Sequence, residues 1–477
     1  MSYCTFKTQL LPESDSEFLS ADLIRQTDLG LVHGTLEQWD NRSVECYLGI
    51  PYAAPPVNLL RFQPPQPHPG WNNTLNATEF GPMCPQELIV FDQMSGKEDC
   101  LTLNIYVPYK DIASSRLLPV MVWLHGGAFV LGSGNYKAHV LADFGQVIVV
   151  TINYRLGVFG FLSTGDRAAV GNSGLLDQRF AISWIKANIK NFGGNPEAIV
   201  IFGQSAGGAS VGLQCLSPLN TGLFKRAILQ SGVAVTAWAT RLDDPSFWAK
   251  KLATILSCPV NDSLSLISCL QAKKPVELVK GAIKLHDFNF KFAPTVDGSF
   301  LPKPPQELSR NTSLVNRFSY VAGVNSHEGS LAWPQIKKIK SQTNFVNFMS
   351  SFLQVPADKV TLVSDTILWE YRDWKDLSNS EFHLQKQALD VVGDSGFVAP
   401  LIMTSDFIAK ANKAVYIYYF TRHPNASVSP EWVGAGHGDE LVFVFGVPIM
   451  GGPLVGDEEL ALSQQIMSYW TNFAKSG

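Results

Sequence analysis

Short apolar runs alternate with helical patterns through much of this sequence, and that alternation restricts its fold more than any other feature. Six runs indicate buried strands, at residues 119–124, 147–153, 199–202, 227–230, 320–324 and 414–420. Residues 177–192 carry apolar side chains at helical spacing, and the pattern ends before a glycine pair. Such alternation is typical of parallel strands covered by helices on both faces. We therefore predict one α/β domain over residues 1–477, with a mostly parallel central sheet.

Charge and hydropathy argue against nucleic-acid binding and against a membrane-spanning helix. The net charge is −4 and no cluster of lysine or arginine is present, which argues against nucleic acid as the main partner. A membrane-spanning helix needs roughly 18 to 20 uninterrupted apolar residues. The most apolar stretch, residues 147–162, is interrupted by Asn153 and Arg155. We predict no transmembrane segment.

Signals for the cellular compartment conflict. Six Asn-x-Ser/Thr sequons favour a secreted glycoprotein. Residues 1–17 show no positive region followed by an apolar run, so no signal peptide is visible. Either the start is not the natural one or the protein stays inside the cell. The six candidate glycosylation sites are Asn41, Asn72, Asn76, Asn261, Asn311 and Asn425.

Seven cysteines leave two interpretations open. Two pairs are close in sequence, Cys84 with Cys100 and Cys258 with Cys269, and would close small loops as extracellular disulfides often do. Scattered buried thiols would fit the same spacing equally well.

A candidate nucleophile lies where the run 199–202 gives way to a segment of small residues. Gly203, Ser205 and Gly207 form a Gly-x-Ser-x-Gly pattern there. A serine on a sharp turn between strand and helix projects its hydroxyl above the sheet, in a strained backbone conformation. Side chains two residues away on either side would collide, so glycine is required at both positions. An ordinary tight turn is the alternative, but the strand before and the helix after favour a nucleophile.

A glycine pair follows the run 119–124, in residues 125–129. Backbone N–H groups in such a turn stabilise the negative charge that forms on a carbonyl oxygen during ester hydrolysis, by about 3 kcal/mol per donor. We predict Gly127, Ala128 and Ala206 as these oxyanion donors. A merely flexible glycine turn is the alternative.

The base and acid of such a site follow the serine in the order acid, then histidine. His437 lies in a small-residue loop beyond the run 414–420 and is the predicted base, with His423 as its competitor. Glu328 follows the run 320–324 and is the predicted acid. Asp297 is the alternative acid, although its Asp-Gly context is typical of a turn.

Five motifs resemble the type-B carboxylesterase and cholinesterase family. They are residues 98–104, the turn 125–129, the triplet 153–155, residues 171–178 and the nucleophile segment 203–207. The resemblance runs from about Leu29 to the last residue. It implies an α/β-hydrolase fold and a triad of Ser205, Glu328 and His437.

The resemblance also implies several supporting features. These are the disulfides Cys84–Cys100 and Cys258–Cys269, the structural ion pairs Arg61–Glu98 and Arg155–Asp177, and support of the acid by Ser231. No metal or organic cofactor is implied, and no ligand-spaced cluster of histidine and cysteine occurs in the sequence.

Within this family, residues 65–71, 161–166, 247–251, 258–260 and 469–475 resemble the bile-salt-activated lipases. Those lipases carry aspartate as the acid, whereas Glu328 resembles the acid of cholinesterases and many carboxylesterases. The interval 85–99 lacks the tryptophan that holds choline in cholinesterases, which argues against acetylcholine as substrate. Family chains continue for some tens of residues past residues 469–475, so we expect a catalytic domain truncated at its C-terminus.

These features predict a secreted carboxylic ester hydrolase that acts on lipid or other hydrophobic esters through an acyl-enzyme, with bile salt as a possible partner. Three alternatives stay open: a general carboxylesterase, an inactive binding module like the neuroligins of this family, and a truncated product that does not mature.

Overall fold

The structure is a computed structural model. It describes residues 23–477 apart from residues 40–41, 87–88, 91–92, 110–115, 286–290, 354, 376–379, 412, 426, 428 and 452–454.

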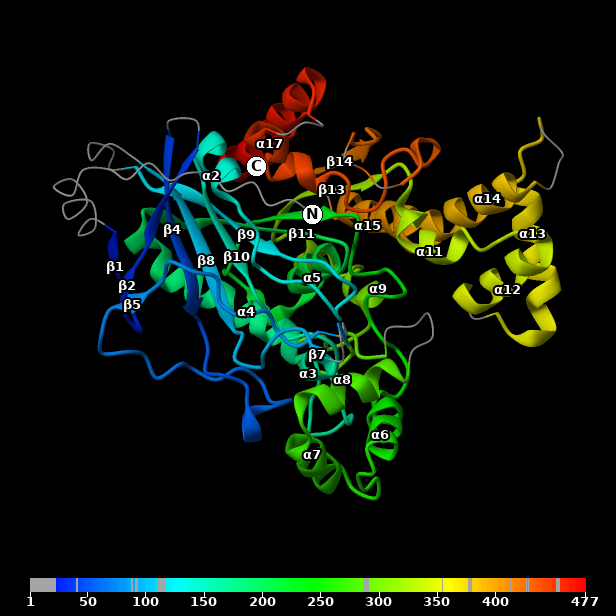
Figure 1. Ribbon diagram of the computed structural model, residues 1–477, viewed down its shortest axis with the longest axis horizontal. Coiled ribbons are helices and arrows are strands. Elements are labelled where there is room, and N and C mark those ends of the chain that lie inside the picture. Colours follow the sequence, from blue (N-terminus) through cyan, green and yellow to red (C-terminus); the bar gives the residue numbers. More distant parts are fainter. Residues whose placement is uncertain are drawn as a thin grey trace.

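A nine-stranded sheet forms the centre of the described chain, in the order β14-β13-β12-β11-β9-β10-β8-β4-β3 (Figure 1). Strands β9 to β14 pair in parallel, whereas β8, β4 and β3 are added antiparallel beyond β10. The bounds are β3 Thr35–Trp39, β4 Arg42–Pro51, β8 Thr102–Pro108, β9 Leu118–Leu124, β10 Ile148–Ile152, β11 Gly194–Gln204, β12 Arg226–Gln230, β13 Ser319–Asn325 and β14 Val415–Phe420.

The six predicted strands correspond to β9 to β14, so the prediction of a mostly parallel sheet is confirmed. The prediction that residues 414–420 form a buried strand is wrong, because β14 lies at the edge of the sheet and exposes Tyr416, Ile417 and Tyr419. The antiparallel edge of β3, β4 and β8 was not predicted. Two small sheets lie outside the central one. They consist of β1 Ile24–Thr27, β2 Gly30–His33 and β5 Leu75–Asn76, and of β6 Ile89–Val90 and β7 Gln93–Met94.

Helices cover both faces of the sheet because successive side chains of its strands point to opposite sides. In β9, Val120 and Val122 join a core with helices α4 (Ser173–Asn188) and α5 (Ala206–Leu216). Trp123, one residue further along, joins the core on the other face, with α2 (His139–Gly145) and α17 (Asp457–Ser476). Figure 1 shows α17 and α2 on one side of the strands and α4 on the other.

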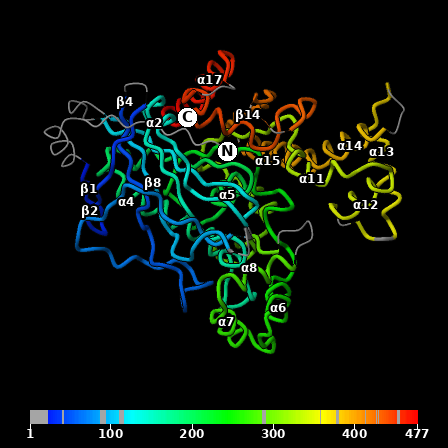
Figure 2. The backbone as a smooth tube through the Cα atoms, viewed as in Figure 1, coloured from blue at the N-terminus to red at the C-terminus, as the bar shows by residue number. Residues whose placement is uncertain are grey.

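Two long excursions leave the sheet. The first, between β12 and β13, contains α6 Pro245–Ile255, α7 Ser263–Ala272, α8 Pro275–Ile283, α9 Pro305–Leu308 and α10 Thr312–Val315. The second, between β13 and β14, contains α11 Trp333–Ile336, α12 Gln342–Leu353, α13 Val360–Glu370, α14 Glu381–Gly393 and α15 Ala399–Lys410. Helices α11 to α14 extend away from the sheet (Figure 2) and have a hydrophobic cluster of their own.

The helical stretch Glu381–Lys410 is the one candidate membrane span among the described residues, by length and hydropathy. Half of its most apolar window is buried inside the protein.

Both implied disulfides are formed, Cys84–Cys100 and Cys258–Cys269. The free cysteines of the described residues, Cys46 and Cys215, are buried. Cys4 lies outside the described residues.

Two buried ion pairs connect distant segments. Arg155, after β10, donates to both carboxylate oxygens of Asp177 on α4 at 2.7 Å, and both side chains are at most 2% exposed. Arg61 makes two contacts of 2.6 Å with Glu98. Its remaining donors reach backbone carbonyls at the end of α7. These pairs hold loops against helices, as the family resemblance implied.

Replacing Asp177 by asparagine keeps the shape of the side chain but leaves the guanidinium of Arg155 buried without its counter-charge. We expect the free energy of unfolding to fall by about 3 to 5 kcal/mol, measured by urea denaturation. As a control, Glu197→Gln breaks the solvent-exposed pair with Lys186 and should cost much less. Equal losses in the two variants would contradict the structural role of the buried pair.

Candidate active site

Ser205 lies in a sharp turn between the end of β11 and the start of α5. Its backbone has φ 58° and ψ −125°, a conformation that costs a non-glycine residue energy. Its N–H donates to the carbonyl of Gln230 at 2.8 Å, which fixes the turn to β12. The turn therefore has the strained conformation expected for a nucleophile.

The two glycines that flank Ser205 allow this turn to pack against β9. A methyl group on Gly207 would lie 2.0 Å from the carbonyl oxygen of Leu124, and one on Gly203 would lie 2.6 Å from the same oxygen. No side chain fits at either position. The sequence argument for both glycines agrees with this packing.

The predicted oxyanion loop follows β9 directly and lies beside the nucleophile. A methyl group on Gly126 would be 2.6 Å from the carbonyl oxygen of Gln204 and 3.1 Å from Cβ of Ser205. Gly127 and Ala128 have φ values of 109° and 56°. Within the described chain, hydrogen bonds from the N–H groups of Gly127, Ala128 and Ala206 to protein acceptors are absent. These donors are available to a ligand.

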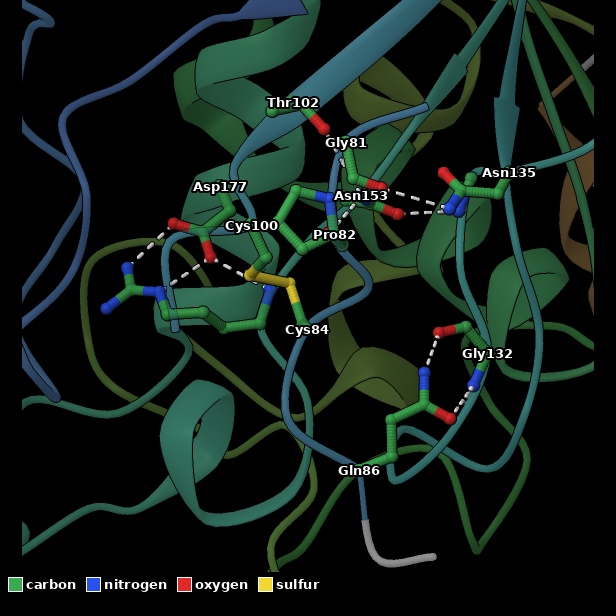
Figure 3. Close-up of a disulfide and its surroundings, with 12 residues drawn as sticks. Gly81, Pro82, Cys84, Gln86, Cys100, Thr102, Gly132, Asn135, Asn153 and Asp177 are labelled. Atoms are coloured by element: carbon green, nitrogen blue, oxygen red, sulfur yellow. Dashed lines mark hydrogen bonds and ion pairs between the residues drawn. A yellow bond between two sulfur atoms is a disulfide. The ribbon is translucent and has the colours of Figure 1, made fainter. Parts of the chain in front are cut away.

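The Cys84–Cys100 loop anchors the oxyanion loop (Figure 3). The Gln86 side chain pairs with the backbone of Gly132 through both its amide nitrogen and its amide oxygen. Asn153 donates to the carbonyl of Pro82 and accepts from Gly134. The disulfide loop thus restrains the segment that carries the predicted oxyanion donors.

Glu328 and His437 meet at the same end of the sheet. Nδ1 of His437 lies 2.5 Å from Oε2 of Glu328, and the backbone N–H of His437 donates to Ser330 Oγ at 2.7 Å. Glu328 is 1% exposed, and its other oxygen accepts from the backbone N–H of Asn325 at 2.6 Å. Burial lowers the pKa of His437, but the carboxylate of Glu328, together with Glu440 and Asp439, more than offsets this, so the pKa lies above its ordinary value.

Nε2 of His437 is bonded to a side chain that the sequence analysis did not select. The side-chain amide nitrogen of Gln204 lies 3.2 Å from it. Among the described residues, Ser205 Oγ and His437 form no direct hydrogen bond. The three predicted residues are therefore gathered at one sheet edge, and Glu328 is bonded to His437. The Gln204 amide occupies the position on Nε2 where a hydrogen bond from Ser205 would form.

Two other candidates lie elsewhere. His423 bonds to the carbonyl of Ser429 at 3.2 Å. Asp297 accepts from Asn172 and from the backbone of Ser299, as a turn residue does.

The expected contact between Ser231 and the acid is not formed. The Ser231 hydroxyl is fully buried, and in the described part of the chain it has no hydrogen-bond partner. Its backbone N–H is held instead by the carbonyl of Gly323, with φ at 49°. That backbone conformation fixes the residue while leaving its hydroxyl unpaired.

Two further residues near the base were also missed. Glu440 is 1% exposed and accepts from Gln230 at 3.1 Å and Asn325 at 2.6 Å. The Phe397 ring lies 4.9 Å from the His437 ring, on a π-helical turn, Asp394–Val398, between α14 and α15. Glu440 follows His437 by three residues in the sequence, and this spacing could have indicated that its carboxylate lies near the imidazole. Phe397 gave none, because the regular helical pattern does not reveal a π turn.

The geometry defines an α/β-hydrolase fold with a serine, a histidine and a glutamate at the carboxyl edge of its sheet. The chain belongs to the carboxylesterase family, whose sequence profile matches residues 21–477.

Named relatives within this family differ in kind. Human bile salt-activated lipase is 40% identical over 91% of this chain and 60% of its own length. Mouse neuroligin-3 is 37% identical over 91% of this chain and 58% of its own length. Mouse neuroligin-2 is 38% identical over 94% of this chain and 60% of its own length. The chain thus spans about three fifths of the length of these relatives.

Glu440 predicts a measurable pH dependence of stability. Burial, together with the nearby Glu328, raises its pKa from 4.5 to about 7. The folded chain therefore keeps a proton that the unfolded chain has lost, and the free energy of unfolding falls as pH rises from about 4.5 to about 7, on the order of 3 kcal/mol in total.

Glu440→Gln cannot titrate, so its stability relative to wild type should increase across this pH range in denaturation curves at pH 5, 6, 7 and 8. Glu458→Gln, at a side chain that is 84% exposed, controls for loss of a negative charge. Parallel pH curves for wild type and Glu440→Gln would contradict the assignment.

Proposed function

We propose that this chain is a serine carboxylic ester hydrolase, with Ser205 as nucleophile, His437 as base and Glu328 as acid. The observation that carries the proposal is the strained turn at Ser205, next to a histidine paired with a buried carboxylate. The unengaged N–H groups of Gly127, Ala128 and Ala206 support it further, because acyl transfer needs donors at that place.

The proposed reaction has two steps. Ser205 Oγ attacks the ester carbonyl carbon while His437 Nε2 takes its proton, and the carbonyl oxygen becomes an anion held by the backbone donors. His437 then gives this proton to the departing alcohol, which leaves an acyl-enzyme. A water molecule, deprotonated by His437, attacks the acyl carbon, and the proton returns to Ser205 as the acid leaves.

For the substrate we propose hydrophobic or lipid esters, with bile salt as a possible activating partner. The 40% identity to human bile salt-activated lipase and the segments that resemble this type of lipase support that choice. A general carboxylesterase remains the other enzymatic possibility. Glutamate in place of aspartate as the acid does not decide between them, since either carboxylate can orient the imidazole.

A binding module without catalytic activity is the second candidate function. One observation favours it: Gln204, and not Ser205, is bonded to Nε2 of His437. The neuroligin relatives, 37% and 38% identical, are nearly as similar to this chain as the lipase is. Retention of serine, glutamate and histidine at the sheet edge is the reason to place this candidate second.

Hydrolysis of p-nitrophenyl esters from acetate to palmitate, with and without taurocholate, tests the proposal. We expect Ser205→Ala to lower kcat/KM by about 10⁴-fold or more, because the nucleophile is lost while the fold is kept. Ser364→Ala, at another buried serine, on helix α13, should change kcat/KM little.

Stimulation of long-chain hydrolysis by taurocholate would favour a lipase, and short-chain hydrolysis indifferent to taurocholate a general carboxylesterase. Folded wild-type protein that hydrolyses none of these esters would contradict the proposal and favour the binding module.

We also propose that the chain is secreted and glycosylated. Five sequon asparagines are exposed, and the two disulfides suit an oxidising compartment. The exposed sites are Asn72, Asn76, Asn261, Asn311 and Asn425. Asn41 lies outside the described residues.

Passage through a eukaryotic secretory pathway should add N-glycans at several of these five positions. Treatment with an N-glycosidase should then reduce the apparent mass, and Asn→Gln at all six sequons, Asn41 included, should abolish that reduction. An unchanged mass in the wild type would contradict glycosylation.

A further inference from the structure

Gln204 lies between the loop of the proposed base and the proposed oxyanion loop. It is the last residue of β11, directly before Ser205, and is 6% exposed. A methyl group on Gly438 would be 3.5 Å from its amide nitrogen, and one on Gly126 would be 3.0 Å from its amide oxygen. The amide thus fills the space that these two glycines leave open.

The contact of this amide with His437 fixes the state of the imidazole. A side-chain NH₂ group donates hydrogen bonds and cannot accept them, so Nε2 of His437 is the acceptor in the 3.2 Å contact. The ring proton is therefore on Nδ1, from where it is donated to Glu328 at 2.5 Å. This is the neutral tautomer that a general base needs, but its lone pair is engaged by Gln204.

From this arrangement, which presupposes the proposed ester hydrolase, we propose that Gln204 is a positioning residue for the base. Its amide binds the Nε2 lone pair in the resting enzyme and competes with the Ser205 hydroxyl for it. Proton transfer from Ser205 to Nε2 requires that the hydrogen bond between the amide and Nε2 break first. The same contact opposes the imidazolium, because an N–H on Nε2 would face the N–H of the amide.

Other groups around His437 set the background for this effect. The carboxylates that face it are Glu328 from the segment after β13, and Asp439 and Glu440 from its own loop. The Phe397 ring covers it from the π turn. Among these groups, Gln204 is the neutral hydrogen-bond donor, and its amide is the group that contacts Nε2 of His437.

Two substitutions change the group that faces Nε2 in different ways: one removes the hydrogen-bond donor, and the other replaces it with a carboxylate. Gln204→Met keeps the length but removes the donor, so Nε2 is free for Ser205, and kcat should rise about threefold to tenfold with little change in KM. Gln204→Glu places a carboxylate beside Nε2 and favours the imidazolium, so the acidic limb of the pH profile of kcat/KM should move up by about one pH unit. Gln385→Met, at a glutamine that is 7% exposed on α14, is the matched control.

A second measurement does not depend on hydrolysis. In a Ser205→Ala background with ¹⁵N-labelled histidine, NMR follows the titration of His437, assigned by its loss in His437→Asn. We expect the midpoint to rise modestly in Gln204→Met and by about one pH unit in Gln204→Glu. The wild-type imidazole should show the proton on Nδ1 at neutral pH.

The outcomes separate the two proposals. Unchanged titration in both Gln204 variants would overturn the role of Gln204, whether or not the wild type hydrolyses esters. Shifted titration together with an unchanged kcat in Gln204→Met would overturn the competition with Ser205. A wild type without hydrolysis, but with the expected shifts, would overturn the proposed function and leave the contact of Gln204 with the base supported.

Discussion

The register between β9 and β11 is the constraint on which the rest of the site depends. Leu124 pairs with Gly203 in parallel strands, so the loop after β9 and the turn after β11 begin side by side. Parallel strands end at the same edge of a sheet, and here that edge has no room for side chains between the two segments. Ser205 and the backbone donors of the oxyanion loop are neighbours for this reason.

Covalent and ionic contacts keep that edge in place from outside the sheet. The Cys84–Cys100 disulfide closes a loop whose Gln86 holds the backbone of Gly132. The Arg155–Asp177 pair fixes the segment after β10 to α4. These contacts lie in the N-terminal half of the chain, whereas Glu328 and His437 come from the C-terminal half. The site is thus assembled from two halves of the chain, which contact each other through Gln204 and His437.

The sequence was sufficient for the parts of the fold that depend on local pattern. Short apolar runs predicted β9 to β14, and glycine spacing predicted the turn at Ser205. The antiparallel strands β3, β4 and β8 were missed because their sequences mix polar and apolar residues without a clear pattern. They also lack the alternation with long helices that marks the parallel strands.

Contacts between distant side chains were not predictable in the same way. Gln204 follows strand pattern and gives no sign that its amide reaches His437, 233 residues away. Ser231 has a buried hydroxyl without a hydrogen-bond partner among the described residues and a backbone φ of 49°, and residue type alone indicates neither. Residue type and spacing thus selected three residues that the structure brings to one sheet edge, but which polar atom bonds to which depended on rotamers fixed by tertiary packing.

The π-helical turn that carries Phe397 is equivalent to one residue inserted into an otherwise regular helix. Deleting a single residue from it would restore an ordinary helix with its hydrogen bonds intact, and the flanking helices α14 and α15 would keep their register because the turn alone holds the extra residue. Phe397 would then turn away from His437 while α14 and the sheet kept their places. The ring contact on the proposed base can therefore be gained or lost by a one-codon insertion or deletion, independently of the residues of the proposed triad.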